Sequence, residues 1–131
     1  MRYLLDTHVF LWALAKPENL SKTAIDLIEN PENILFLSSA SIWEISIKQT
    51  IGKLKILDKS LDLKIFVEKA IEDLNLLKLP IQFEHIYTLH NIPYHHKDPF
   101  DRILIAQSMA ENLILITDDK MIKKYKVKTI W

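Results

Sequence analysis

The sequence predicts an α/β fold in which helices cover both faces of a parallel sheet. Short apolar runs of strand length recur along the chain, and segments with apolar residues every three or four positions separate them. Parallel strands need such crossover connections, and their burial on both faces makes them continuously apolar. With 131 residues, one glycine and no repeated or biased segment, the chain should form one domain that is ordered nearly from end to end.

Four short apolar runs are the expected strands of this sheet. They cover residues 3–5, 34–37, 76–80 and 113–116, and an alternating pattern at 127–130 is typical of an additional edge strand.

Capping residues mark the helices of the first half of the chain. Asp6 and Thr7 stand where the first strand passes into a helix, and Ser21 is the expected N-cap of the second helix. A third helix begins near Ser39 and ends at Gly52, the only glycine. A connector with basic character follows.

Helical periodicity continues in the second half. Apolar residues from Leu61 to Leu74 predict a fourth helix, and residues 81–91 predict a fifth. The last helix begins at Pro99, whose fixed φ suits a first turn, and Asp98 is its natural N-cap. Asn112 is the expected stop.

The composition excludes several classes of protein. Seventeen basic side chains balance seventeen acidic ones, so the overall charge does not indicate a nucleic-acid or membrane partner. The absence of cysteine excludes disulfides, thiol catalysis and thiolate zinc sites. No apolar run reaches the length of a membrane span or a signal-peptide core, so we expect a soluble cytoplasmic protein.

Acidic residues gather where the strands of the predicted sheet end. Asp6 ends the first strand and Asp118-Asp119 follow the fourth, while Glu44 and Asp101 lie on helices next to that edge. Ligands of open parallel sheets bind outside the carboxyl ends of the strands. Clustered carboxylates repel one another unless protons or cations neutralise them, and Mg²⁺ or Mn²⁺ prefers their oxygens. Such a site can activate water for phosphodiester hydrolysis.

Each acid also has an ordinary structural explanation. Asp6 and Asp98 are good helix caps, and Asp101 complements the helix dipole. Glu44 and Lys48 have the spacing of an i,i+4 pair on a helix surface. Glu44 has bulky apolar neighbours, however, so it should be partly buried and need a partner.

Four motifs follow one another in a specific order and spacing. They are LLDTH at 4–8, SIWEISIK at 41–48 with GKL at 52–54, DPFDR at 98–102 with IAQ at 105–107, and LITDD at 115–119. Together they resemble the PIN-domain ribonucleases, and within them the VapC-type toxins of type II toxin–antitoxin pairs. The resemblance covers essentially the whole chain. It implies a single PIN domain over residues 1–131, a three-layer sandwich with a central parallel sheet of four to five strands.

The resemblance also implies roles for particular residues. The metal-binding and catalytic acids would be Asp6, Glu44, Asp101 and Asp119. Thr117 would orient water or backbone, Asp98 would be an extra acid, and Asp118 would be an alternative to Asp119. Arg102 could pair with a carboxylate or reach a phosphate. Lys48 and Lys120 are candidates for contacts with the substrate.

The implied activity is Mg²⁺- or Mn²⁺-dependent endonucleolytic cleavage of RNA, with water as the nucleophile. A small antitoxin would block the site, and the protein would form a homodimer. Three alternatives remain: a housekeeping PIN nuclease without an antitoxin, a phosphatase-like enzyme, and a non-catalytic α/β interaction module. Phosphatases with an aspartate nucleophile at this position place a second acid two residues later, where this chain has His8.

Histidines close to Asp98 raise the alternative of a transition-metal site. His90, His95 and His96 precede it, but no two histidines have i,i+4 spacing, and adjacent side chains on a loop often point apart. We therefore interpret these histidines as solvated loop residues near the RNA rather than as ligands.

Overall fold

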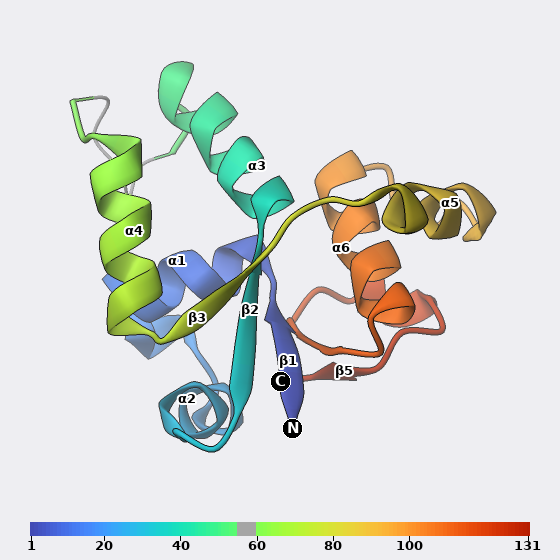
Figure 1. Ribbon diagram of the computed structural model, residues 1–131, viewed down its shortest axis with the longest axis horizontal. Helices are drawn as coiled ribbons and strands as arrows, with labels where there is room; N and C mark the ends of the chain where they lie inside the picture. Colours follow the sequence, from blue (N-terminus) through green and yellow to red (C-terminus); the bar gives the residue numbers. More distant parts are fainter. Residues whose placement is uncertain (55–59) are drawn as a thin grey trace.

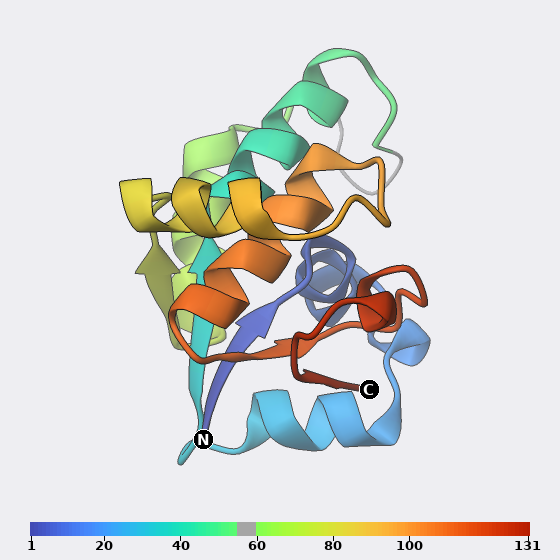
Figure 2. The same ribbon diagram turned by 90° about the vertical axis from the view of Figure 1, so that its right-hand side faces the viewer.

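The computed structural model describes residues 1–54 and 60–131. It contains a parallel sheet between two layers of helices (Figure 1 and Figure 2). The strands are β1 (Arg2–Leu5), β2 (Ile34–Ser38), β3 (Leu76–Leu79), β4 (Ile114–Ile116) and β5 (Thr129–Ile130). They are ordered β3-β2-β1-β4-β5, and all neighbouring pairs are parallel. The α/β class and the three-layer arrangement are confirmed. Residues 55–56 of the predicted basic connector lie outside the described residues.

The helices have the expected order, and their caps follow the sequence signals. They are α1 (Thr7–Ala15), α2 (Lys22–Glu29), α3 (Ser39–Thr50), α4 (Leu63–Asp73), α5 (Phe83–Asn91) and α6 (Pro99–Ala110), with 3₁₀ turns η1 (Pro17–Asn19) and η2 (Ile122–Lys124). The Ser21 and Asp98 side chains accept backbone N–H groups at the starts of α2 and α6. Asn112 ends the α6 segment with a positive φ of 54°, which asparagine tolerates.

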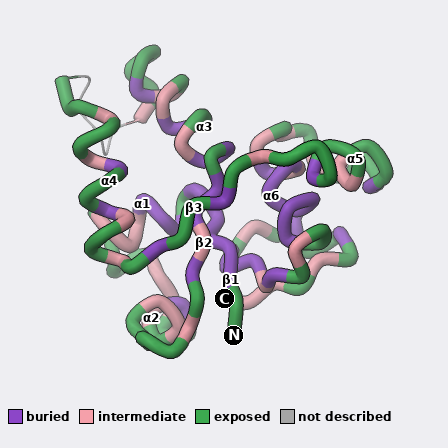
Figure 3. Tube along the Cα trace, viewed as in Figure 1, coloured by how far each residue is buried: buried purple, intermediate pink, exposed green. Residues whose placement is uncertain are grey.

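Alternating side chains of the strands divide the core between the two faces of the sheet. Leu5 and Leu35 pack with residues of α1, α2 and α4 on one face. Leu4 and Leu115 pack with α6 on the other face, where Leu104 is completely buried. Figure 3 shows buried residues concentrated on β1, β2 and α6. Among the described residues, no helix is long and apolar enough to cross a membrane.

The strand order reverses at β1. The chain passes from β1 to β2 and β3 on one side, and later adds β4 and β5 on the other. The Asp6 N–H donates to the Ile116 carbonyl (3.1 Å), which extends the β1–β4 pairing to the carboxyl ends of both strands. In an open α/β sheet such a reversal leaves a crevice outside the strand ends, where ligands bind. The polar segments that follow β1 and β4 meet there.

Candidate metal centre

Asp6 and Thr117 connect the ends of the two central strands. The Asp6 side chain is 3% exposed; its Oδ1 accepts the His8 N–H (3.4 Å) and its Oδ2 accepts the Thr117 hydroxyl (2.6 Å). The Thr117 Oγ1 also accepts the Asp119 N–H (3.1 Å). Burial raises the pKa of Asp6 above its ordinary value, although the Thr117 hydrogen bond opposes this. Thr117 therefore orients both an acid and the backbone of a second acid.

Glu44 enters the centre from α3 and is paired with a cation. It is 2% exposed, and its Oε2 lies 2.6 Å from the Lys48 Nζ one helical turn away. Burial lowers the pKa of Lys48, but the hydrogen bond and the charge of Glu44 outweigh it and raise the pKa. The predicted i,i+4 pair thus exists, but its acid is buried. The Lys48 charge is engaged with Glu44 before any substrate arrives.

His96 brings the remaining two acids together. Its Nε2 lies 2.9 Å from the Asp101 Oδ2 and 3.2 Å from the Asp119 Oδ2. Oδ1 of Asp119 accepts the Met121 N–H (2.8 Å), which fixes the carboxylate after β4. These three side chains could together hold a metal ion, because one ligand atom from each lies within 4.8 Å of the others.

Electrostatic repulsion is strongest at Asp101. Burial raises its pKa to about 8, and the negative charges of the surrounding acids add to this rise. Those acids, in decreasing order of effect, are Asp6, Asp98, Glu44 and Asp119. The carboxylates predicted from the sequence are therefore close enough to influence one another, and one of them keeps a proton at neutral pH.

Two further acids near the centre, Asp98 and Asp118, have different surroundings. Asp98 caps α6 by accepting the N–H groups of Phe100 (2.8 Å) and Asp101 (3.3 Å). Asp118 is exposed, whereas Asp119 contacts His96, so the geometry favours Asp119 as the fourth acid.

Arg102 and Lys120 lie apart from the contacts of the cluster. The expected pairing of Arg102 with a carboxylate is not found in residues 1–54 and 60–131. Its guanidinium donates to the Ile92 carbonyl (3.4 Å) and lies over the Tyr94 ring (4.9 Å). The physical reason is the helix: adjacent residues point in different directions, so Arg102 faces the loop before α6 when Asp101 faces the acids. Lys120 is exposed.

His96 is the site residue that the sequence interpretation missed. Its side chain is 16% exposed and contacts two acids, so it is not a solvated loop residue. His95 and His96 do point apart, as expected for neighbours on a loop: the His95 ring packs on Tyr125 (5.1 Å between centroids). The only available signal was the short distance in sequence from His96 to Asp98 and Asp101.

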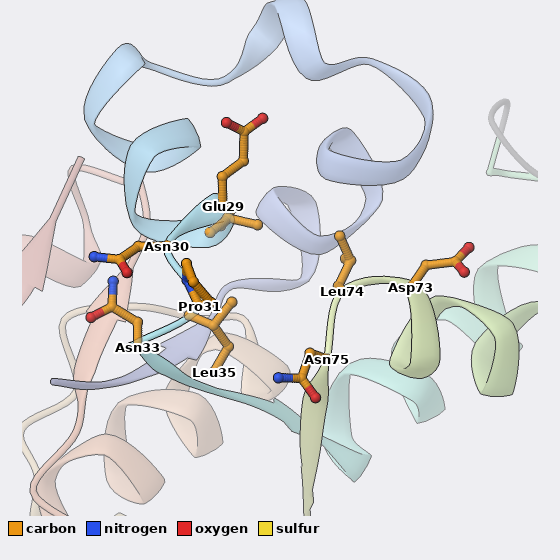
Figure 4. Close-up of a pocket in the computed structure, with 9 residues that line it drawn as sticks. Glu29, Asn30, Pro31, Asn33, Leu35, Asp73, Leu74 and Asn75 are labelled. Carbon is orange, nitrogen blue, oxygen red and sulfur yellow. The ribbon is translucent and has the colours of Figure 1, made fainter.

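A separate cavity lies near the opposite edge of the sheet (Figure 4). Its volume is about 270 Å³, and it lies beside the segments that enter β2 and β3, with Asn33 and Asn75 in its wall. None of the acids of the centre lines it. This cavity is therefore separate from the candidate metal centre.

The donor set fits a hard divalent cation. Oε1 of Glu44 is buried and has no hydrogen-bond partner among the described residues, although buried carboxylate oxygens normally have one. Burial and the charges of the neighbouring carboxylates raise the pKa of Asp101, and a bound cation would offset both effects. Mg²⁺ or Mn²⁺ takes carboxylate oxygens as ligands and would supply the missing positive charge. Asp6, Glu44, Asp101 and Asp119 could hold it.

Several solved structures share this fold. A chain in the structure of VapBC2 from Rickettsia felis bound to a DNA fragment from their promoter is 18% identical, with a TM-score of 0.71 over 100% of this chain and 99% of that one. A chain of FitAcB from Neisseria gonorrhoeae is 18% identical, with a TM-score of 0.65, and the match covers 100% of this chain and 97% of that one. A chain of VapBC-1 from nontypeable Haemophilus influenzae is 16% identical, with a TM-score of 0.62, and the match covers 99% of this chain and 97% of that one.

Sequence comparison identifies the family directly. No curated protein matches the chain. The family model of the PIN domain, in contrast, matches residues 3–128 and thus includes every acid of the candidate centre. The chain therefore belongs to the PIN domain family.

Proposed function

We propose that this protein is a Mg²⁺- or Mn²⁺-dependent endoribonuclease of the cytoplasm, and that it is the toxin of a toxin–antitoxin pair. The observation that carries the proposal is the convergence of buried acids at the carboxyl edge of β1 and β4, where Asp101 has a pKa of about 8. Membership of the PIN domain family supports a nuclease. The activity would belong to a single domain over residues 1–131.

The side chains have distinct tasks in this proposal. Asp6, Glu44, Asp101 and Asp119 hold the cation, and Thr117 keeps the Asp6 carboxylate turned toward it through the 2.6 Å hydrogen bond. Lys48 offsets the charge of Glu44 and is close enough to Asp98 and Asp101 for their charges to affect it. When bound, the cation would lower the pKa of a water molecule and stabilise the charge that develops on the phosphate.

Substrate binding would use exposed cations near this edge. Lys120 directly follows Asp119, and Lys123 and Lys124 follow in η2, all of them exposed. Lysines of this kind contact phosphates without reading sequence. A net charge of zero makes such local groups more important than the overall field.

The toxin assignment draws on the structural relatives. A further solved structure of this fold, VapBC-5 from Mycobacterium tuberculosis, is named as a member of the VapBC family of toxin–antitoxin systems, and VapBC2 was solved with a DNA fragment from the promoter. By analogy we propose a cognate antitoxin that covers the acids of this chain, and a homodimeric toxin. A housekeeping nuclease of the same family would have no such partner.

The activity is tested on purified protein with a labelled RNA panel and matched DNA. We expect RNA cleavage with Mg²⁺ or Mn²⁺, none with a chelator, and loss of cleavage in the Asp6→Asn and Asp101→Asn variants. Asp26→Asn on α2 is a matched control, because Asp26 pairs with Lys22 on the exposed surface. Full activity of Asp6→Asn protein would contradict the proposal.

The toxin role needs a second experiment. Induced expression should arrest growth of the host, and coexpression of a small open reading frame adjacent to the gene should restore it. The product of that frame should also inhibit RNA cleavage in vitro. Light scattering tests the dimer. Cleavage without toxicity or a specific inhibitor would instead favour the housekeeping nuclease.

A further inference from the structure

The His96 ring is fixed at both of its nitrogens. Nδ1 accepts the backbone N–H of Asp98 (3.2 Å), while Nε2 faces the carboxylates of Asp101 (2.9 Å) and Asp119 (3.2 Å). One nitrogen therefore meets a backbone donor, and the other meets two carboxyl groups.

This arrangement selects one protonation pattern of the imidazole. An N–H group can point only at a lone pair, so Nδ1 must be unprotonated to accept from Asp98. The proton then resides on Nε2, where it can be donated to the carboxylates. In the other neutral form, a proton on Nδ1 would place two donors against each other.

The backbone around the ring is fixed from two directions. The buried Tyr125 hydroxyl accepts the N–H groups of both His95 and His96 (2.9 Å each). On the other side, Asp98 is fixed as the cap of α6 by its own hydrogen bonds. The position of the ring therefore follows from the fold rather than from a free loop.

His85 provides an internal comparison away from the acids. Its Nδ1 accepts the Gln82 N–H (3.0 Å), and its Nε2 lies 2.9 Å from the Glu111 Oε1. The chain thus uses the same pairing twice, a backbone N–H at Nδ1 and a carboxylate at Nε2.

We propose that His96 is a positioning residue that holds the carboxylates of Asp101 and Asp119 through its Nε2–H and is not a metal ligand. A coordinating nitrogen must be unprotonated, and Nε2 carries the proton. This inference rests on the metal centre of the proposed function. Its consequence is an all-oxygen ligand set, which prefers Mg²⁺ and Mn²⁺ and lacks the imidazole that favours zinc.

The protonation pattern is measured by ¹⁵N NMR of histidine-labelled, full-length protein with and without saturating Mg²⁺, which is diamagnetic. His96→Gln protein assigns the His96 signals. We expect a protonated Nε2 and an unprotonated Nδ1 in both states. A protonated Nδ1 in either state, or loss of the Nε2 proton upon Mg²⁺ binding, would overturn the inference.

Substitutions test the positioning role by calorimetric titration with Mg²⁺. The amide nitrogen of glutamine can reach the place of Nε2, so His96→Gln should keep the affinity within about threefold, whereas His96→Asn should weaken it by roughly 10- to 100-fold. His95→Asn is the matched control, because its ring packs on Tyr125, and it should leave the affinity unchanged. Melting temperatures without metal separate misfolding from this effect.

The outcomes also separate this inference from the proposed function. If wild-type protein does not bind Mg²⁺, both the metal centre and the role of His96 are refuted. If Mg²⁺ binds but His96→Asn and His96→Gln have equal affinities, only the role of His96 is refuted. Binding with the predicted difference between the two variants supports both.

Discussion

Metal binding should release a proton from Asp101. The pKa of this carboxyl is about 8 rather than 3.8, so the metal-free protein keeps it protonated at neutral pH. A cation that needs the carboxylate must displace the proton, and the apparent affinity then rises tenfold per pH unit below the pKa. Between pH 6.0 and 7.5 the Kd for Mg²⁺ should fall by about 25-fold. Above pH 8 the dependence should flatten.

Calorimetry in buffers of different ionisation enthalpy counts the protons directly. At pH 6.5 we expect about one proton released per bound Mg²⁺, because Asp101 has a pKa of about 8. A Kd independent of pH, with no proton release, would refute the reasoning. Asp26→Asn protein should behave like wild type, since Asp26 is exposed and lies on α2.

The same shift predicts how the stability of the metal-free protein depends on pH. Between about pH 4 and pH 8 the folded state binds a proton at Asp101 that the unfolded state has lost. This contribution is fully present below pH 4 and is lost as the pH rises through 8, at about 1.4 kcal/mol per pH unit. Asp101→Asn should remove this slope in urea denaturation with chelator, and a slope equal to that of wild type would count against the assignment.

Three further substitutions test separate parts of the structure. Lys48→Met should destabilise the metal-free protein by about 1–3 kcal/mol, because Glu44 is left buried without a cation. Mg²⁺ should then raise the melting temperature of this variant more than that of wild type, and equal shifts in melting temperature would contradict this. Asp98→Ala should cost about 1 kcal/mol in urea denaturation and Asp98→Ser much less, because only alanine removes the cap of α6. Leu104→Ala should cost about 2–5 kcal/mol in the same assay, since this side chain is fully buried, and a loss below 1 kcal/mol would place it outside the core.

Sequence alone could predict where the acids meet, because parallel topology decides it. Asp6 and Asp119 follow strands, and the carboxyl ends of parallel strands share one edge whatever the details of packing. The burial of Glu44 was also visible in its apolar neighbours. Asp6 and Asp98 do cap α1 and α6, but helix capping does not explain the raised pKa of Asp101.

Side-chain direction on the loop before α6 could not be predicted in the same way. The placement of His96 depends on Tyr125, which is 29 residues away and lies beyond β4. The placement of Arg102 depends on the Ile92 carbonyl and on the Tyr94 ring, which local patterns do not reveal. Long-range hydrogen bonds set these directions, and periodicity carries no information about them.

The pairing of β1 with β4 has a consequence for biosynthesis. β1 leaves the ribosome before β4, and the Thr117 hydroxyl that orients Asp6 comes 111 positions after Asp6 in the sequence. The centre therefore cannot assemble while the chain is short, since the contacts of highest sequence separation form only after β4 is available. In the proposed function, cleavage would therefore begin only after residue 119 has been synthesised.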